Sequence, residues 1–160
     1  MKTYEKNNER YVSKVFRDVF DKYDLMNDAM SLGIHRLWKK KFIDWLNPQE
    51  NTKLIDVASG TGDIAKNFLE KVNYKSFVYC VDENKEMLDL SKKKLNNNKN
   101  IKWFCNNAEK LPFEDNFFNY YTISFGIRNV SKINVALEEA YRVLKPGGRF
   151  LCLEFSKVQN

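Results

Sequence analysis

Two glycines, Gly60 and Gly62, stand between an apolar segment and a predicted helix, in the stretch KLIDVASGTGDIAKNF of residues 53–68. Together with Ala65 they match the pattern Gly-x-Gly-x-x-Gly/Ala, which holds the phosphates of dinucleotides. Asp82 follows at about the distance where that pattern has an acid for a ribose. The stretch therefore predicts a turn that binds a nucleotide-like ligand. On this pattern alone, a glycine turn without a ligand remains the alternative.

The charges beside the turn bear on which ligand it holds. Gly62 is followed by Asp63 rather than by Lys and Ser or Thr, which excludes a Walker A phosphate loop. Asp63 also places a negative charge at the helix N-terminus, where the pyrophosphate of a dinucleotide would bind. Asp56 adds a second acid before the turn. Acids on both sides favour a ligand with positive charge, such as S-adenosylmethionine, over a nicotinamide dinucleotide.

The elements that must position this turn alternate between strands and helices. Alternation with nearly continuous apolar strands predicts an α/β fold whose parallel sheet is covered on both faces. The last helix is expected to stop at Lys145-Pro146-Gly147-Gly148, a strong breaker. Apolar residues at helical spacing predict two earlier helices and hence a helical N-terminal lobe, residues 1–50, before a ligand-binding domain, residues 51–160. Strands are expected at 53–58, 76–82, 101–106, 117–125 and 149–155, and helices at 11–23, 35–46, 63–72, 84–95 and 132–144.

Polar residues close several of the predicted strands, where parallel sheets bind their ligands. The carboxylate of Asp82 can accept hydrogen bonds from both ribose hydroxyls. Asn107, with Ala108, closes the third strand, where an amide could bind the edge of an adenine, and Ser124 lies at the end of the fourth. Met87 is expected either to pack on the adenine face or to belong to the helix core.

Composition sets broad limits. A chain of 160 residues with 43% hydrophobic residues suits a globular domain, and its net charge of +6 favours a solvated surface over a nucleic-acid or membrane site. Cys80, Cys105 and Cys152 are far apart and are expected to be buried thiols, and with one histidine a zinc site is not expected. No apolar run is long enough to span a bilayer and no signal peptide is evident, so the chain as given is expected to be soluble.

Longer motifs resemble a known family. DVASGTGD, VDENKEML, NNAEKLPFEDNFFN and AYRVLKPGGRFLCLEFSK are similar to class I S-adenosylmethionine-dependent methyltransferases. KYDLMNDAMSLGIHRLWK and ISFGIRN resemble, more specifically, the ubiquinone/menaquinone biosynthesis C-methyltransferases, from about residue 12 to residue 160. The resemblance implies a Rossmann-like sheet, of whose usual seven strands this chain supplies five. The fifth strand would then form a sheet edge, which predicts self-association and weak or no methyl transfer, unless a partner chain completes the sheet.

The resemblance also implies roles for individual residues. The cofactor contacts of the family fall on Thr61, Asp82, Asn107, Ala108 and Ser124. The glycines, acids and helix position discussed above add Asp56, Gly60, Gly62, Asp63 and Met87 as expected cofactor contacts. The family usually has Gly where this chain has Ser59, which is tolerable only if Ser59 avoids positive φ.

The substrate that the resemblance implies is a polyprenylated hydroquinone, methylated at a ring carbon. Arg128 in the FGIRN motif is the catalytic candidate, because a cation beside the phenol would stabilise its phenolate. The alternative is that Arg128 pairs with a carboxylate such as Glu154. Tyr23 and Asn27 would line the quinol pocket, with a core role the alternative for Tyr23. His35 is expected to pack at a helix start rather than act as a base.

An isoprenoid tail implies work at a membrane surface, at the matrix side of the mitochondrial inner membrane in a eukaryote or otherwise in the cytoplasm at the membrane. The expected protein partners are further copies of the chain, in a homo-oligomer, or the members of a quinone-biosynthesis complex. The rival function is a non-catalytic cofactor-binding or scaffold subunit of such a complex. Nucleic-acid methyltransfer is not expected, because the Asn/Asp-Pro-Pro-aromatic motif and a catalytic Cys after Pro are both missing.

Overall fold

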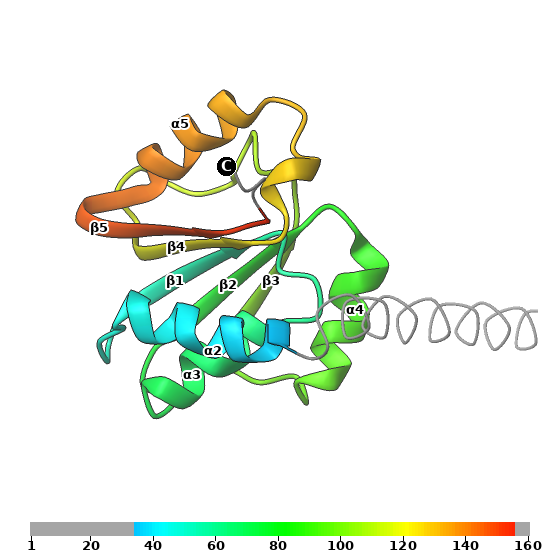
Figure 1. Cartoon of the computed structure of the whole chain (residues 1–160), viewed down its shortest axis with the longest axis vertical. Helices are drawn as coiled ribbons and strands as arrows, with labels where there is room; N and C mark the ends of the chain where they lie inside the picture. The colour runs from blue at the N-terminus through cyan, green and yellow to red at the C-terminus, as the bar shows by residue number, and fades with distance from the viewer. Residues whose placement is uncertain (1–33, 156–160) are drawn as a thin grey trace, which may run out of the picture. The chain divides into compact units, whose positions relative to one another are not determined.

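The computed structural model describes residues 34–155, and the chain divides into two compact units, residues 1–38 and 39–160. The predicted helix at 11–23 and the candidates Tyr23 and Asn27 lie outside the described residues. The second unit carries the glycine turn and all the described strands, which form one parallel sheet (Figure 1). Residues of the helix that precedes the first strand belong to the core of this unit.

The five described strands follow the order β3-β2-β1-β4-β5, and every neighbouring pair is parallel. This confirms the predicted parallel sheet. Aromatic, β-branched and other apolar side chains on both faces of β1, β2 and β4 are buried, which is typical of strands covered on both sides. The bounds are β1 Lys53–Val57, β2 Phe77–Asp82, β3 Ile101–Cys105, β4 Phe118–Ser124 and β5 Leu144–Leu153.

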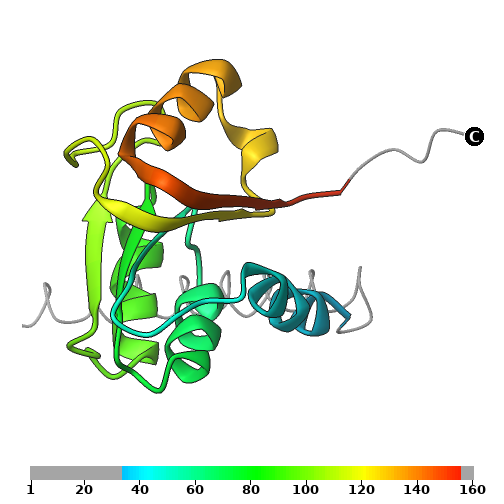
Figure 2. The same cartoon turned by 90° about the vertical axis from the view of Figure 1, so that its left-hand side faces the viewer.

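Helices cover the two faces of the sheet (Figures 1 and 2). Leu54 of β1 packs in one core with α3 and with Phe42 and Leu46 of α2, whereas its neighbour Ile55 packs in a second core with α5. This alternation follows from the strand pleat, which turns successive side chains to opposite faces. The bounds are α2 Ile34–Leu46, α3 Asp63–Lys71, α4 Lys85–Lys94 and α5 Ile133–Val143, with a short 3-10 helix η1 at Ile127–Asn129.

The start of β5 differs from the prediction. Helix α5 ends at Val143, but the expected breaker Lys145-Pro146-Gly147-Gly148 lies inside β5 rather than in a connection before it. The pairing explains this: Phe118 of β4 lies opposite Leu144, and Tyr120, two residues on, lies opposite Arg149, five residues on. The strand therefore begins with a bulge, and proline and glycine are tolerated at bulges.

The expectation of three buried thiols was wrong for two of them. Cys80, in the central part of the sheet, is buried, but Cys105 and Cys152 are exposed. They lie on β3 and β5, the edge strands of the described sheet, where fewer neighbours cover a side chain. Within residues 34–155, no group of three or more His, Cys, Asp or Glu side chains could hold a metal ion.

Candidate functional site

The glycine turn lies at the point where the strand order reverses. The neighbours of β1 are β2 and β4, so the chain crosses to the other side of β1 after β3. In open α/β sheets such a reversal leaves a crevice at the carboxyl ends of the strands, where ligands bind. The turn follows β1, and Asp82 and Ser124 end β2 and β4. The structure thus brings the predicted strand-end residues together at the carboxyl ends of the neighbouring strands.

The backbone of the turn is left-handed at three positions. Ala58, Gly60 and Gly62 have φ values of 53°, 51° and 75°. A Cβ added to Gly60 would meet only the Ala58 carbonyl oxygen, at 4.0 Å, so space beside the turn stays open to a ligand. Ser59 is not among the residues with positive φ, which satisfies the condition under which a serine is tolerated there.

Gly126, after β4, approaches the same turn closely. A Cβ added to it would lie 2.4 Å from the Cβ of Ala58, closer than real Cβ atoms come. This close approach explains why the position before Ile127 in the FGIRN motif is a glycine, since any side chain there would push the two loops apart.

Asp82 organises the turn from the neighbouring strand. Its Oδ2 accepts a hydrogen bond from the backbone N–H of Gly60 at 2.9 Å, and its Oδ1 accepts one from Asn84 at 2.9 Å. A carboxylate oxygen can accept more than one hydrogen bond, so both remain able to accept from a diol. Asn84 in turn caps α4 by accepting from the Met87 N–H at 3.0 Å. Met87 is half-buried in the first turn of α4.

Ser91 of α4 contacts the glycine turn, and the sequence did not predict this contact. It is fully buried on α4, and its hydroxyl contacts the Gly60 carbonyl and donates to the Met87 carbonyl, the latter at 2.8 Å. Because the hydroxyl oxygen lies within hydrogen-bond reach of both carbonyls, it fastens the glycine turn to α4. A buried serine on a polar helix gave no pattern that would have indicated this contact.

Asp56 is a buried acid near the end of β1, just before the turn. Only 1% of its surface is exposed, and its Oδ1 accepts a hydrogen bond from the Thr122 hydroxyl at 2.8 Å. Burial raises the pKa of Asp56 to about 7, although the hydrogen bond from Thr122 and the charge of Lys39 act in the opposite direction. Thr122, within an apolar strand, was not predicted as part of the site.

Asp63 is held by two lysines. Its carboxylate lies 2.8 Å from the Lys39 ammonium and 3.2 Å from that of Lys94. Burial raises the pKa of Asp63, but the two positive charges outweigh it and hold the pKa well below its usual range. In the sequence Asp63 is a negative charge beside the turn, whereas in the structure Lys39 and Lys94 compensate that charge within the protein. Its role toward a ligand stays a prediction.

The remaining strand-end residues differ in their surroundings. Asn107 is exposed, and its Oδ1 accepts from the Glu109 N–H at 2.7 Å, which orders the loop after β3. Ala108 and Thr61 are buried. The hydroxyl oxygen of Ser124 is buried and, among the described residues, has no hydrogen-bond partner.

Arg128 lies in η1, directly after β4, and forms an ion pair with Glu154. Its guanidinium also lies 5.9 Å from the ring centre of Phe155. The pairing with Glu154 is the alternative that the sequence analysis had named. The catalytic role stays a prediction. His35 is buried in the first turn of α2, as expected of a residue that packs at a helix start.

Comparisons with known proteins agree on one family. A model described as the ubiE/COQ5 methyltransferase family matches residues 4–160. A relative from Rickettsia prowazekii, named "Ubiquinone/menaquinone biosynthesis C-methyltransferase UbiE", is 55% identical over 155 residues, which cover 93% of this chain and 62% of the relative. The relative of the same name from Rickettsia massiliae is 56% identical over 156 residues, with the same coverage. The chain thus spans less than two thirds of the length of these relatives.

Solved structures support the fold. A SAM-dependent methyltransferase from Aquifex aeolicus is 25% identical, with a TM-score of 0.69 over 76% of this chain and 66% of that one. A putative methyltransferase from Bacillus halodurans is 27% identical, with a TM-score of 0.70 over 76% of this chain and 52% of that one. The predicted Rossmann-like architecture is therefore confirmed.

Proposed function

Because the chain belongs to the ubiE/COQ5 methyltransferase family, we propose that it forms the cofactor-binding part of an S-adenosylmethionine-dependent C-methyltransferase. The reaction would methylate a ring carbon of a polyprenylated hydroquinone in ubiquinone or menaquinone biosynthesis, the pathways that the names of the relatives give. Since the chain spans 62% of those relatives, the activity proposed is that of the whole protein.

Two oxygens carry this proposal. Asp56 Oδ2 and Ser124 Oγ are buried side-chain atoms that have no hydrogen-bond partner in residues 34–155. They lie near the carboxyl ends of β1 and β4, beside the glycine turn. A buried polar atom without a partner is costly, and such atoms are typical of sites completed by a ligand or by water. The residues present therefore fit a ligand with hydrogen-bond donors and positive charge.

The residues divide the binding of S-adenosylmethionine among them. The carboxylate of Asp56 and the hydroxyl of Ser124 would accept from the ammonium group of its methionine part. Asp82, whose oxygens already hold the turn, would accept from the ribose hydroxyls. Asn107 and Met87 would contact the adenine at its edge and face. When bound, the cofactor supplies a methyl group on a sulfonium, which is a strong electrophile.

Arg128 would act on the substrate. A hydroquinone ring carbon becomes a good nucleophile once the phenol loses its proton, and a cation beside the oxygen stabilises that phenolate. Arg128 remains charged throughout and so would stabilise the phenolate rather than accept the proton. Its guanidinium has five donors, so the Glu154 pair can orient it and still leave N–H groups for the substrate. The in-line alignment of carbon, methyl and sulfur would contribute much of the rate.

A membrane surface is the proposed place of work, because an isoprenoid tail dissolves poorly in water. Trp45 of α2 is 71% exposed and has the exposed Lys40 and Lys41 nearby in sequence, a combination that suits the interface of an anionic membrane. Among residues 34–155, no helix has the length and apolar character to cross a bilayer. Co-sedimentation with anionic liposomes, compared between the protein and Trp45→Ala, tests this, and equal binding by both would exclude a role for Trp45.

Calorimetry with S-adenosylmethionine and with NAD tests the cofactor. We expect binding of S-adenosylmethionine only, and binding of NAD alone would overturn the proposal. Ser124→Ala should lower the affinity for S-adenosylmethionine without lowering the melting temperature, because it removes an oxygen that lacks a partner in the free protein. Ser131→Ala, at an exposed serine of the connection between β4 and α5, is the matched control and should bind as the wild type does.

Methyl transfer to a short-chain demethyl-quinol tests the reaction itself. Transfer to a ring carbon, located by mass spectrometry of the product, is the expected result for the whole protein. Cofactor binding without transfer would instead favour the scaffold function.

A further inference from the structure

A pocket lies at the opposite ends of the strands from the glycine turn. A pocket of about 420 Å³ is lined by residues of the α2–β1 connection, the start of β4 and the first half of β5. These segments meet at the amino ends of the parallel strands, whereas the glycine turn lies at the carboxyl ends. The pocket is therefore separate from the proposed methyl-transfer site.

The β5 bulge shapes one wall of this pocket. Gly147 has a φ of 77°, and a Cβ added to Gly148 would lie 2.8 Å from the Lys145 carbonyl oxygen and 3.1 Å from that of Asn119. Gly148 thus has no room for a side chain, and Gly147 has a left-handed backbone that favours glycine, so both residues shape the loop beside the start of β4. Lys145 and Arg149 flank the two glycines and both line the pocket.

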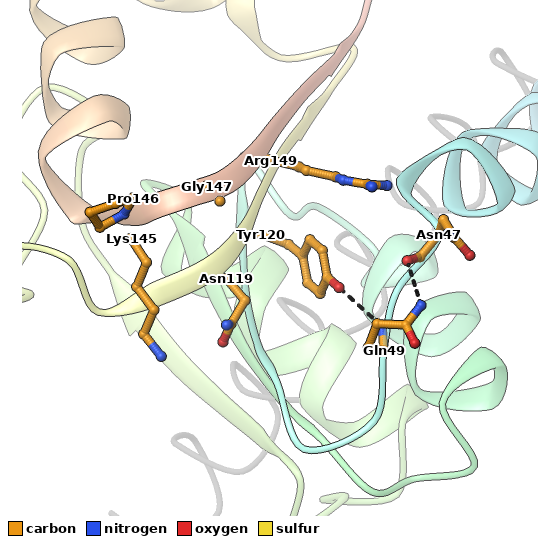
Figure 3. A pocket seen from close by; sticks show the side chains of 9 residues that line it. Asn47, Gln49, Asn119, Tyr120, Lys145, Pro146, Gly147 and Arg149 are labelled. Atoms are coloured by element: carbon orange, nitrogen blue, oxygen red, sulfur yellow. Dashed lines mark hydrogen bonds between the residues drawn. The ribbon is translucent and has the colours of Figure 1, made fainter.

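The pocket has positive charge and no acid of its own. Lys145 and Arg149 lie on either side, with Asn119 and Tyr120 between them (Figure 3), and no Asp or Glu is among the lining residues. In the part of the chain that the structure describes, no carboxylate pairs with Lys145. Glu50, adjacent in sequence to the lining residue Gln49, is held by Lys75 at 2.9 Å.

The hydrogen bonds around the pocket occupy some of its donors and leave others able to bind a ligand. The Asn119 Oδ1 accepts from the Lys53 N–H at 3.0 Å, which leaves the amide NH₂ to donate. The Tyr120 hydroxyl oxygen accepts from the Gln49 N–H at 3.0 Å and so keeps its own proton to donate (Figure 3). Arg149 donates one N–H to the Leu46 carbonyl at 3.0 Å, and a guanidinium has five.

We propose that this pocket binds a phosphate group. Two cations and two further side chains with donors line this pocket, and ammonium and guanidinium groups both bind phosphate oxygens. A dianion with several acceptor oxygens can use more of these donors than a carboxylate can. A phosphate there would connect β5 and β4 with the chain that leads into β1. A soluble phosphate ester or diphosphate and the headgroup of an anionic phospholipid share this chemistry.

Two substitutions test the site. Asn119→Asp keeps the oxygen that accepts from the Lys53 N–H and replaces the donating nitrogen with a charged oxygen, so the fold is retained while phosphate is repelled. Lys145→Gln removes a cation that has no ion pair in residues 34–155 and should also fold. The matched controls are Asn96→Asp and Lys99→Gln, which make the same charge changes at exposed positions outside the pocket.

The probes are inorganic phosphate, pyrophosphate, acetate, and phosphatidylcholine vesicles with and without phosphatidic acid. Affinity is measured by calorimetry, and the site is located from amide shifts in nuclear magnetic resonance spectra. We expect phosphate or pyrophosphate to shift the amides of Asn119, Gly147 and Gly148. We expect Lys145→Gln to weaken binding about tenfold and Asn119→Asp to weaken it further. The control variants should stay within about twofold of the wild type, as expected for distant screened charges.

The outcomes separate the possibilities. Dependence on Lys145 and Asn119 with the soluble anions assigns a soluble ligand, and the same dependence with phosphatidic acid vesicles alone assigns a headgroup; both support a phosphate site. Equal losses in the test and control variants, equal binding of acetate, or no binding of any phosphate probe would overturn it. The affinity of Asn119→Asp for S-adenosylmethionine should be unchanged, so failure here would be distinguishable from failure of the proposed function.

Discussion

Replacing Asp56 by Asn should stabilise the protein and weaken cofactor binding at the same time. Asparagine has nearly the same shape and keeps an oxygen to accept from the Thr122 hydroxyl, so the packing of this buried position is preserved. The substitution removes only the ionisation. It therefore isolates what the buried charge does to stability and to binding.

The magnitude follows from the pKa of Asp56, which burial raises from 3.8 to about 7. Each pKa unit corresponds to about 1.4 kcal/mol, so the ionised carboxylate lowers the free energy of unfolding by at most about 4 kcal/mol. Because the folded-state pKa is the higher one, the contribution to stability is fully present below about pH 4 and is lost as the pH rises through about 7. Asp56→Asn has no such loss.

Urea unfolding of the two proteins across this pH range measures the difference directly. Near pH 4 the wild type and Asp56→Asn should be about equally stable, and near pH 8 the variant should be more stable by up to about 4 kcal/mol. Asp44→Asn is the control, because Asp44 is an exposed acid whose pKa is lowered by Lys71, so any change should be small and of opposite sign. A difference for Asp56→Asn that stays constant with pH, or that shrinks as the pH rises, would refute the reasoning.

Cofactor binding gives the second arm of the same prediction. An ammonium group favours the ionised Asp56, so the affinity of the wild type for S-adenosylmethionine should rise with pH up to about 7 and then level off. Asp56→Asn should bind about tenfold more weakly near pH 8 and lose this pH dependence. Calorimetry at several pH values checks both. An unchanged affinity would exclude Asp56 as the partner of the ammonium group.

Three further substitutions test other parts of the site. Thr122→Val removes the hydroxyl that donates to Asp56, and urea unfolding near pH 8 should show a loss of about 1–3 kcal/mol that is smaller near pH 4. Gly126→Ala places a Cβ against that of Ala58, and should lower the free energy of unfolding by about 1–3 kcal/mol and weaken cofactor binding. Arg128→Gln should lower the rate of methyl transfer by about 100-fold with unchanged affinity for S-adenosylmethionine, and an unchanged rate would leave Arg128 a structural residue.

The sheet could be predicted because its signal is local. Apolar runs bounded by breakers located all five described strands within a few residues, and the glycine turn marked the exit of β1. The exception was the start of β5. In the sequence, Pro146 and the two glycines indicate the end of a helix, but in the structure they form a bulge within the strand. A bulge depends on the partner strand, and single-sequence patterns do not contain the pairing of Phe118 with Leu144.

The site could be predicted only in part, because several of its contacts join segments that are far apart in the sequence. Residue types at strand ends indicated Asp82 and Ser124, because the topology of a parallel sheet brings those ends together. The lysines that neutralise Asp63 come from α2 and α4, and the hydroxyl that holds Asp56 comes from β4. None of these partners has a fixed sequence spacing from the acid that it contacts. The prediction of buried thiols was wrong for Cys105 and Cys152 for a related reason, because their exposure depends on which strands lie at the edges of the sheet.

The two hydrogen bonds that Asp82 accepts from the backbone have a consequence for the kinetics of binding. Because Oδ2 accepts from the Gly60 N–H and Oδ1 accepts from the Asn84 N–H, contacts within the protein order the glycine turn. An incoming cofactor then loses little free energy to ordering the loop, and association need not wait for a rare conformation. The Asp82 carboxylate would contact both the ribose hydroxyls and the backbone of the turn. A ligand that lacks the ribose diol, such as free methionine, would therefore meet a preorganised loop but lose the contact that Asp82 offers.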